Sequence, residues 1–264
     1  MLNAVNFDDN RSWAPSLATA LEPLLPQDIV SQISSTCPEH IEDTRDALLS
    51  IGDRDQLIDA VLYWLRSNKL YAYHGTRLNE DEVRSIRHSG LRVLDAESRA
   101  TRLIRALSAH ANWPSLSPQL DHFLRAHGTD GRSGDRQGQA HLTLARSGVL
   151  ESFNQYLHYG SEFDQRVAHD LLGDYGLELL AKDGEPIILK FAVPGPEALS
   201  AAHPHFNIQM LRRQGDIPNI VQEFLSAWSY WLVHPEFHAS QLGVDCGLRF
   251  DDTVPLGWLV DVEY

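Results

Sequence analysis

The most informative part of the chain is the segment Leu70-Tyr71-Ala72-Tyr73-His74-Gly75-Thr76-Arg77. Its first four residues are apolar or aromatic, which predicts a strand that breaks at His74-Gly75-Thr76. A helix is expected from Asn79 to His88, because acidic residues fill its first turn and Ser89-Gly90 follows its end. A strand that ends in His-Gly would place an imidazole at a sheet edge, beside backbone that glycine leaves open to a ligand.

Strands and helices alternate along the rest of the chain. Two helical regions are predicted, at Glu97–His127 with breaks at Pro114 and Pro118, and at Gly148–Leu172 with an interruption at Tyr159-Gly160. The polar Gly128–Gly138 segment is predicted to be a mobile loop. Four further strands are expected, at Ala140–Leu144, Pro186–Pro194, Leu248–Phe250 and Trp258–Val262. This mixture predicts an α+β fold.

The first 68 residues are predicted to be helical throughout. Their clearest pattern is one apolar stripe at a 3.6-residue period, formed by Leu57, Ile58, Val61, Leu62 and Leu65. Shorter helical patterns occur at Ser16–Leu25, Asp28–Ile33 and His40–Leu49. We therefore expect two domains, a helical N-terminal extension at residues 1–68 and an α+β domain at residues 69–264.

Composition excludes several classes of protein. The 264 residues carry 22 basic and 36 acidic side chains, a formal net charge of −14 that disfavours broad binding to nucleic acid or anionic membranes. Two cysteines, Cys37 and Cys246, exclude a disulfide scaffold and a four-cysteine zinc site. No phosphate-binding Gly-x-x-x-x-Gly-Lys-Ser/Thr sequence and no Gly-x-Ser-x-Gly nucleophile elbow occur.

No targeting signal is evident. Residues Met1 to Asp9 lack the positive start and the apolar run of a signal peptide, and no stretch reaches the roughly 18 apolar residues of a membrane helix. We therefore expect a soluble, cytoplasmic protein without a membrane partner.

The segment from Tyr73 to Leu91 resembles the first motif of the ADP-ribosyltransferase superfamily, on the branch of diphtheria toxin and the poly(ADP-ribose) polymerases. That motif is a strand followed by His-Gly-Thr, a short helix and Gly-Leu. The resemblance extends from about Leu70 to Val262 and implies a split mixed β-sheet core with helical insertions. The residues before Lys69 lie outside it.

The same resemblance implies an NAD site. His74 would form a hydrogen bond with a ribose hydroxyl of NAD, and the Gly75 backbone would contact the nicotinamide amide. Thr76 would support the turn, and Arg77 would belong to the same NAD-binding segment. The glycine-led Gly138–Leu144 segment, followed by the helix that starts near Ser152, matches the family's next motif.

A tyrosine from that helix would stack on the nicotinamide ring. Tyr156 and Tyr159 are both candidates, and the distance from the strand favours Tyr156. Without a ligand, such tyrosines would be half-buried helix residues.

A glutamate completes the site that the resemblance implies. Cleavage of the glycosidic bond gives the ribose oxocarbenium character, which a nearby carboxylate stabilises. Glu223 is the first candidate for this catalytic role, Glu162 the second and Glu236 the third. Glu223 departs from the family pattern, because helical spacing of apolar residues surrounds it whereas the family glutamate starts a strand.

The implied function is an NAD-dependent ADP-ribosyltransferase that releases nicotinamide and modifies a macromolecular acceptor, either protein or nucleic acid. Domains of this kind often act as toxins, effectors or defence enzymes, so an inhibitor or antitoxin is a further expected partner. The main alternative is a catalytically inactive member of the same fold that binds a nucleotide or a protein.

Two other features suggest different chemistry. A metal-dependent hydrolase would use His203, His205, His234 and His238, although Pro235 disfavours one helix through the last two. Surface histidines explain these pairs adequately, and we expect no metal ligands. In the Gly-rich loop, Arg132 and Arg136 have the chemistry to clamp a phosphate, but a solvated loop accounts for them as well.

Overall fold

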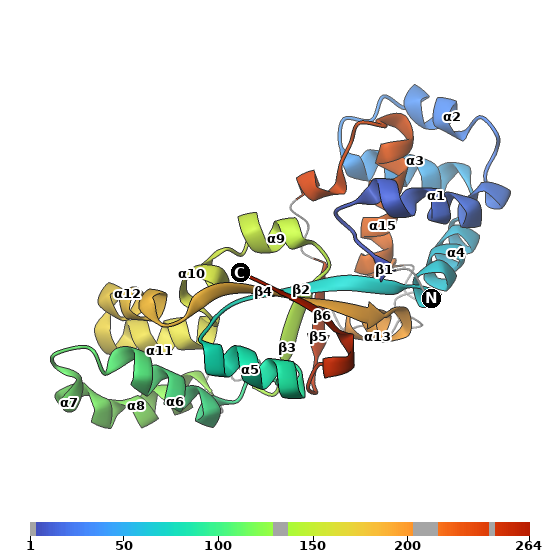
Figure 1. Ribbon diagram of the computed structural model, residues 1–264. Coiled ribbons are helices and arrows are strands. Elements are labelled where there is room, and N and C mark those ends of the chain that lie inside the picture. Colours follow the sequence, from blue (N-terminus) through green and yellow to red (C-terminus); the bar gives the residue numbers. More distant parts are fainter. Residues whose placement is uncertain (1–3, 129–136, 203–215, 243–245) are drawn as a thin grey trace. The chain divides into compact units, whose positions relative to one another are not determined.

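The computed structural model describes residues 4–128, 137–202, 216–242 and 246–264 (Figure 1). The fold is α+β, 60% helical and 16% strand, with a mostly antiparallel sheet. The α+β class predicted from the sequence is therefore confirmed. The predicted loop at Gly128–Gly138 lies largely outside the described residues.

The described strands form one six-stranded sheet. They are β1 (Ala4–Val5), β2 (Lys69–Leu78), β3 (Ala140–Thr143), β4 (Glu185–Pro194), β5 (Gly247–Phe250) and β6 (Leu259–Glu263). Their order is β5-β3-β2-β4-β6, and β1 pairs in parallel with the start of β2. Strands β4 and β6 are antiparallel, with Leu189 opposite Val262 and a register shift between Lys190 and Phe191. The four downstream strands predicted from the sequence are all present.

The chain divides into two compact units. The first unit comprises residues 1–72, 143–148 and 192–248, and the second comprises residues 73–142, 149–191 and 249–264. The N-terminal helices thus share a unit with residues 192–248. The division predicted at residues 68 and 69 stays a prediction.

Helices and one aromatic cluster build the first unit. Its helical elements are α1 (Asn10–Leu21), η1 (Glu22–Leu24), α2 (Ile29–Ser35), α3 (Ile41–Ile51), α4 (Arg54–Arg66), α13 (Gly195–Ala201), α15 (Asn219–Val233) and η4 (Ala239–Leu242). Phe224 of α15 has its ring 5.0 Å from that of Trp13 on α1 and 5.5 Å from that of Trp64 on α4. The predicted apolar stripe of α4 is buried, and Asp53 caps that helix by accepting from the Gln56 amide.

The second unit contains a separate helical core. Its helical elements are α5 (Glu80–Ser89), α6 (Ala96–Leu107), α7 (Trp113–Leu116), η2 (Ser117–Gln119), α8 (Leu120–His127), α10 (Gln155–Tyr159), α11 (Glu162–Leu172), α12 (Asp174–Lys182) and η5 (Leu256–Trp258), while α9 (Arg146–Glu151) crosses the division. Leu103, Leu124, Val167 and Leu180 contribute to one buried cluster from α6, α8, α11 and α12. The interruption predicted at Tyr159-Gly160 separates α10 from α11.

Three local predictions need correction. Residues 1–68 are not helical throughout, because Ala4–Val5 pairs with β2 as a strand. Strand β2 does not break at His74-Gly75-Thr76 but continues to Leu78, since Thr76 and Leu78 are buried and extend its alternating pattern. Helix α12 lies beyond the helical region predicted to end at Leu172, and a Cβ added to its Gly176 would lie 2.2 Å from the Ala168 carbonyl oxygen. Glycine thus permits close packing of α12 on α11.

Candidate functional site

His74 lies inside β2, with its ring fixed against the neighbouring strand. Its Nδ1 is 2.7 Å from the carbonyl oxygen of His141 on β3, so Nδ1–H donates and Nε2 carries the lone pair. Burial lowers the pKa of His74, the hydrogen bond to His141 raises it, and the positive charge of Arg99 lowers it further. The neutral ring is therefore favoured, with Nε2 as a hydrogen-bond acceptor. Because β2 lies between β3 and β4, the prediction that this imidazole stands at a sheet edge is wrong.

Gly75 is required by packing. A Cβ added to it would lie 2.4 Å from a methyl group of Val149 on α9 and 3.4 Å from one of Leu157 on α10. The space on this side of Gly75 is therefore filled by apolar side chains. Glycine here lets α9 and α10 approach β2 closely.

Thr76 and Arg77 join β2 to its surroundings. Thr76 is buried at 6% exposure. The half-buried Arg77 donates from Nη1 to the carbonyl oxygen of Leu157, over 3.3 Å. The second unit thus brings the His74–Arg77 segment of β2 into contact with α10.

Both candidate stacking tyrosines belong to α10. Tyr156 and Tyr159 are half-buried, and Tyr159 has the His158 ring as a neighbour, with centroids 6.0 Å apart. Gly160 ends the helix at φ +82°, a conformation that favours glycine, and its N–H donates to the Tyr156 carbonyl over 2.9 Å. Tyr156, Tyr159 and His74 therefore belong to one unit, as the proposed site requires.

A charged cluster connects β2 with α11, and sequence reasoning missed it. Arg99, Arg102 and Arg105 recur every three residues on α6, a spacing that places them along one side of the helix. Their acidic partners come from three other segments and are Glu82, Asp164 and Asp183. The arginine spacing was readable in the sequence, but its partners were not.

The centre of this cluster is buried. The Asp164 carboxylate is fully buried and accepts from Arg99, with Nε at 2.9 Å from Oδ1. Arg102, with 2% of its side chain exposed, donates from Nη1 to the carbonyl oxygen of Arg77. Burial lowers the pKa of Arg99 to about 9 and also lowers that of Arg102, whereas the hydrogen bonds that Arg105 donates to Asp183 raise the pKa of Arg105.

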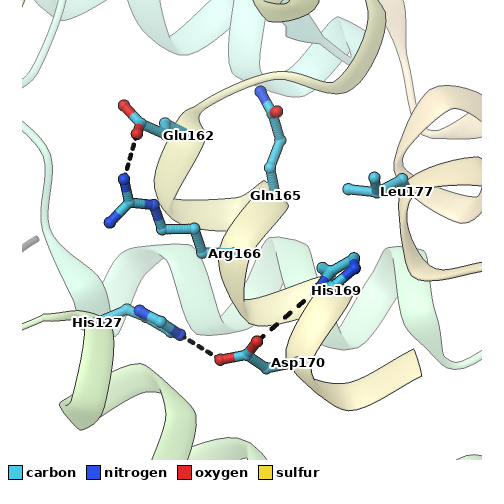
Figure 2. Close-up of a pocket in the computed structure, with 7 residues that line it drawn as sticks. All are labelled: His127, Glu162, Gln165, Arg166, His169, Asp170 and Leu177. Carbon is cyan, nitrogen blue, oxygen red and sulfur yellow. Dashed lines mark hydrogen bonds and ion pairs between the residues drawn. The ribbon is translucent and has the colours of Figure 1, made fainter. Parts of the chain in front are cut away.

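Glu162, the second candidate glutamate, lines a surface hollow of about 310 Å³ (Figure 2). It is in the first turn of α11 and pairs with Arg166 over 2.5 Å. Across the hollow, His127 of α8 pairs with Asp170, with 2.6 Å between Nε2 and Oδ2. Nδ1 of His169 lies 3.9 Å from the same carboxyl group. Gln165 donates to the Gly160 carbonyl over 2.8 Å, which ties this wall of the hollow to the end of α10.

Glu223 lies on α15 in the first unit, whereas His74 and both tyrosines belong to the second. Burial raises the pKa of its carboxyl group, the positive charge of Arg45 lowers it, and the negative charge of Glu42 raises it. The protonated form is thus favoured relative to an exposed glutamate. The helical placement that the sequence indicated for Glu223 is confirmed.

The other candidates are less constrained. Glu236 is 97% exposed in its side chain and pairs with Arg11 over 3.3 Å in the first unit. His234 has its ring 4.3 Å from that of Tyr230. His203, His205, Arg132 and Arg136 lie outside the described residues. Within the described part of the chain, no group of three or more His, Cys, Asp or Glu side chains could hold a metal ion.

Among the described residues, no helix is long and apolar enough to cross a membrane. Comparison with models of protein families, with curated proteins and with solved structures finds no match to this chain.

Proposed function

We propose that the chain is an ADP-ribosyltransferase that uses NAD as its substrate. The observation that carries the proposal is the His74 imidazole, which donates from Nδ1 to the His141 carbonyl and keeps Nε2 as an acceptor. A ribose hydroxyl is a donor that suits this nitrogen, and burial lowers the pKa of the ring and so favours its neutral form. The contact of the same β2 segment with α10 supports a site that also uses Tyr156 or Tyr159.

The fold is compatible with this proposal at the level of its class. A mostly antiparallel sheet interrupted by helices suits the split sheet of the ADP-ribosyltransferase superfamily. The sequence motif and the His74 geometry supply the finer assignment, which remains part of the proposal.

The reaction breaks the bond between the anomeric carbon of the ribose and the nicotinamide nitrogen. Nicotinamide leaves with the bonding electrons, and the ribose acquires positive charge that a carboxylate stabilises. A nucleophile of the acceptor then bonds to the anomeric carbon and loses its proton. The acceptor is a protein side chain or a nucleic acid base, and a role as toxin, effector or defence enzyme depends on its identity.

Two glutamates remain as the main candidates for the carboxylate. Glu162 shares a unit with His74 but is paired with Arg166. Glu223 is buried enough that its pKa is raised, which disfavours the ionised form. The pairing of Glu162 with Arg166, together with the raised pKa of Glu223, favours the alternative function, an inactive member of the fold that binds a nucleotide or a protein.

Nicotinamide release from NAD tests the proposal. Purified protein is incubated with NAD, with and without cell extract as the source of acceptor, and nicotinamide is quantified by chromatography. We expect release that His74→Ala abolishes and that His122→Ala, a change at an exposed histidine of α8, leaves unchanged. Glu162→Gln and Glu223→Gln identify the carboxylate, since replacement of the functional one lowers turnover at least about 100-fold.

The other outcomes have definite meanings. NAD binding without release, measured by calorimetry, would support the inactive binding module. The absence of both NAD binding and nicotinamide release would refute the proposal. A release that His74→Ala does not change would remove its main support.

A further inference from the structure

We infer that Arg102 is a positioning residue that connects the His74–Arg77 segment of β2 to the turn after Tyr159, and so holds the two parts of the NAD site at a fixed spacing. The inference rests on the proposed function, because both segments belong to the proposed site. All of these residues lie in the second unit.

One guanidinium group reaches both segments. Nη1 of Arg102 donates to the carbonyl oxygen of Arg77, three residues after His74. Nη2 of the same group lies 2.8 Å from the point where a Cβ of residue 160 would stand, so Gly160 packs directly on it. Because Gly160 follows Tyr159 and ends α10, movement of this guanidinium would release the strand and the turn together.

The ion pairs of Arg102 do not explain why it is buried, because its acidic partners have other cations. Arg102 Nη1 is 3.5 Å from Glu82, and its Nε is 3.5 Å from Asp164 and 3.8 Å from Asp183. The same three acids have closer or equal partners, namely Arg99 for Asp164 at 2.9 Å, Arg105 for Asp183 at 2.7 Å and Arg105 for Glu82 at 3.4 Å. Loss of Arg102 therefore leaves no carboxylate of the cluster without a cation.

What Arg102 alone supplies is the link between the Arg77 carbonyl and Gly160. Burying a guanidinium costs free energy, and the lowered pKa of Arg102 reflects that cost. Its Nε and Nη2 also make no hydrogen bond within the described residues. Replacement of a whole buried ion-pair network by apolar side chains of similar volume is often neutral or stabilising, so ion pairing alone does not account for a buried arginine. The contacts of Arg102 with the Arg77 carbonyl and with Gly160 account for its burial, which its ion pairs do not.

The test compares Arg102→Met with Arg105→Met. The two arginines are three residues apart on α6 and both pair with Glu82 and Asp183, but Arg105 is exposed, and among the described residues the Arg77 carbonyl and Gly160 are contacted by Arg102 instead. Amide hydrogen exchange in residues 74–78 and 156–162 is measured by mass spectrometry, together with kcat and KM of nicotinamide release.

We expect Arg102→Met to accelerate exchange in both segments about tenfold or more, as the loss of one charge-assisted hydrogen bond implies. We also expect it to raise KM for NAD by a similar factor while kcat changes less than about threefold. Arg105→Met should leave both segments and KM unchanged. Should Arg102→Met fail to fold, Arg102→Lys retains the buried charge but has only one nitrogen, and its exchange should accelerate in at least one segment.

Unchanged exchange in both segments would overturn the inference, as would equal effects of Arg102→Met and Arg105→Met. A global acceleration across α8 and α12 would also overturn it, because the role of Arg102 would then be structural only. If the wild-type protein releases no nicotinamide, the proposed function fails, whereas the exchange measurement still decides whether Arg102 couples the two segments.

Discussion

Replacement of Gly75 by alanine tests how closely α9 and α10 pack on β2. The added methyl group would lie 2.4 Å from Cγ1 of Val149, and ordinary contact begins at 3.4 Å, so 3.4 − 2.4 = 1.0 Å of separation must be gained. Val149 is 3% exposed, and a methyl group of Leu157 lies 3.4 Å from the added one, so the clash falls on a buried side chain. Relief of the clash requires Val149, or the helix that holds it, to move away from the strand.

Two terms set the size of the effect. Overpacking of a buried contact costs about 1–3 kcal/mol, and the smaller conformational freedom of alanine in the unfolded chain returns about 0.5–1 kcal/mol. Gly75→Ala alone is therefore expected to lower the free energy of unfolding by about 0–2.5 kcal/mol. Val149→Ala alone removes two buried methyl groups and is expected to cost about 2 kcal/mol.

The decisive quantity is the coupling between the two changes. In Gly75→Ala/Val149→Ala the clash with Cγ1 is absent, so the double variant should be more stable than the sum of the single effects by about 1–3 kcal/mol. Urea denaturation of the wild type and the three variants measures this difference. Additive effects, with a coupling below about 0.5 kcal/mol, would refute the close packing of Val149 on Gly75.

Three further predictions concern charge. The pKa of His74, measured by NMR, is expected to lie below its usual value of 6.5, and Arg99→Met should raise it. Between the folded-state pKa and 6.5 the unfolded chain binds more protons than the folded one, so the free energy of unfolding should fall as pH falls below about 6.5. This fall should be smaller in His74→Gln. Asp164→Asn should cost about 3–5 kcal/mol in urea denaturation, because Arg99 loses its closest anion and Arg102 one of its two nearest, and a loss under about 1 kcal/mol would contradict this. Since the folded-state pKa of Glu223 is raised, stability should decline as pH rises from about 4.5 through the folded pKa, and Glu223→Gln should flatten that decline; an unchanged pH profile would show that the carboxyl group is not desolvated.

Local sequence rules predicted the ends of α5 to within one residue, whereas α1 begins at Asn10 and not at Ser16. In a capping box at the start of α5, the Asn79 side chain accepts from the Glu82 backbone N–H and the Glu82 side chain accepts from the Asn79 backbone N–H. The apolar stripe of α4 predicted which of its residues are buried, because a helix turns every 3.6 residues whatever it packs against. Such features depend on neighbours in the chain, which the sequence contains.

Features that depend on distant residues were not readable. His74-Gly75-Thr76 has the composition of a turn, yet β2 continues through it because β3 and β4 flank that strand. The space beside the Gly75 Cα is filled by Val149 and Leu157, which lie more than 70 residues further along the chain. The glycine indicates a close approach, but only the fold shows which side chain makes it.

The candidate site likewise has parts that the sequence predicts and parts that depend on distant residues. The His-Gly-Thr-Arg segment could be located from its sequence, since strand, histidine and glycine are contiguous. The groups that hold this segment in place could not be located in that way, because the His141 carbonyl belongs to another strand and Arg102 belongs to a helix. A backbone carbonyl carries no residue-specific signal, so no motif could have named His141 as the group that orients the imidazole.

The choice of glutamate depends on solvation more than on spacing. A carboxylate that stabilises an oxocarbenium ion must be ionised before the bond breaks, and it must not already be neutralised by a neighbouring cation. Glu223 meets the second condition better than the first, because burial raises its pKa while Arg45 only partly opposes the shift. Glu162 has its cation, Arg166, at 2.5 Å, so its charge is compensated in the absence of substrate. For Glu162 to act, binding of NAD would have to draw Arg166 away from Glu162 toward a phosphate. That change is chemically favourable, since an arginine side chain forms a paired hydrogen bond with phosphate as readily as with carboxylate.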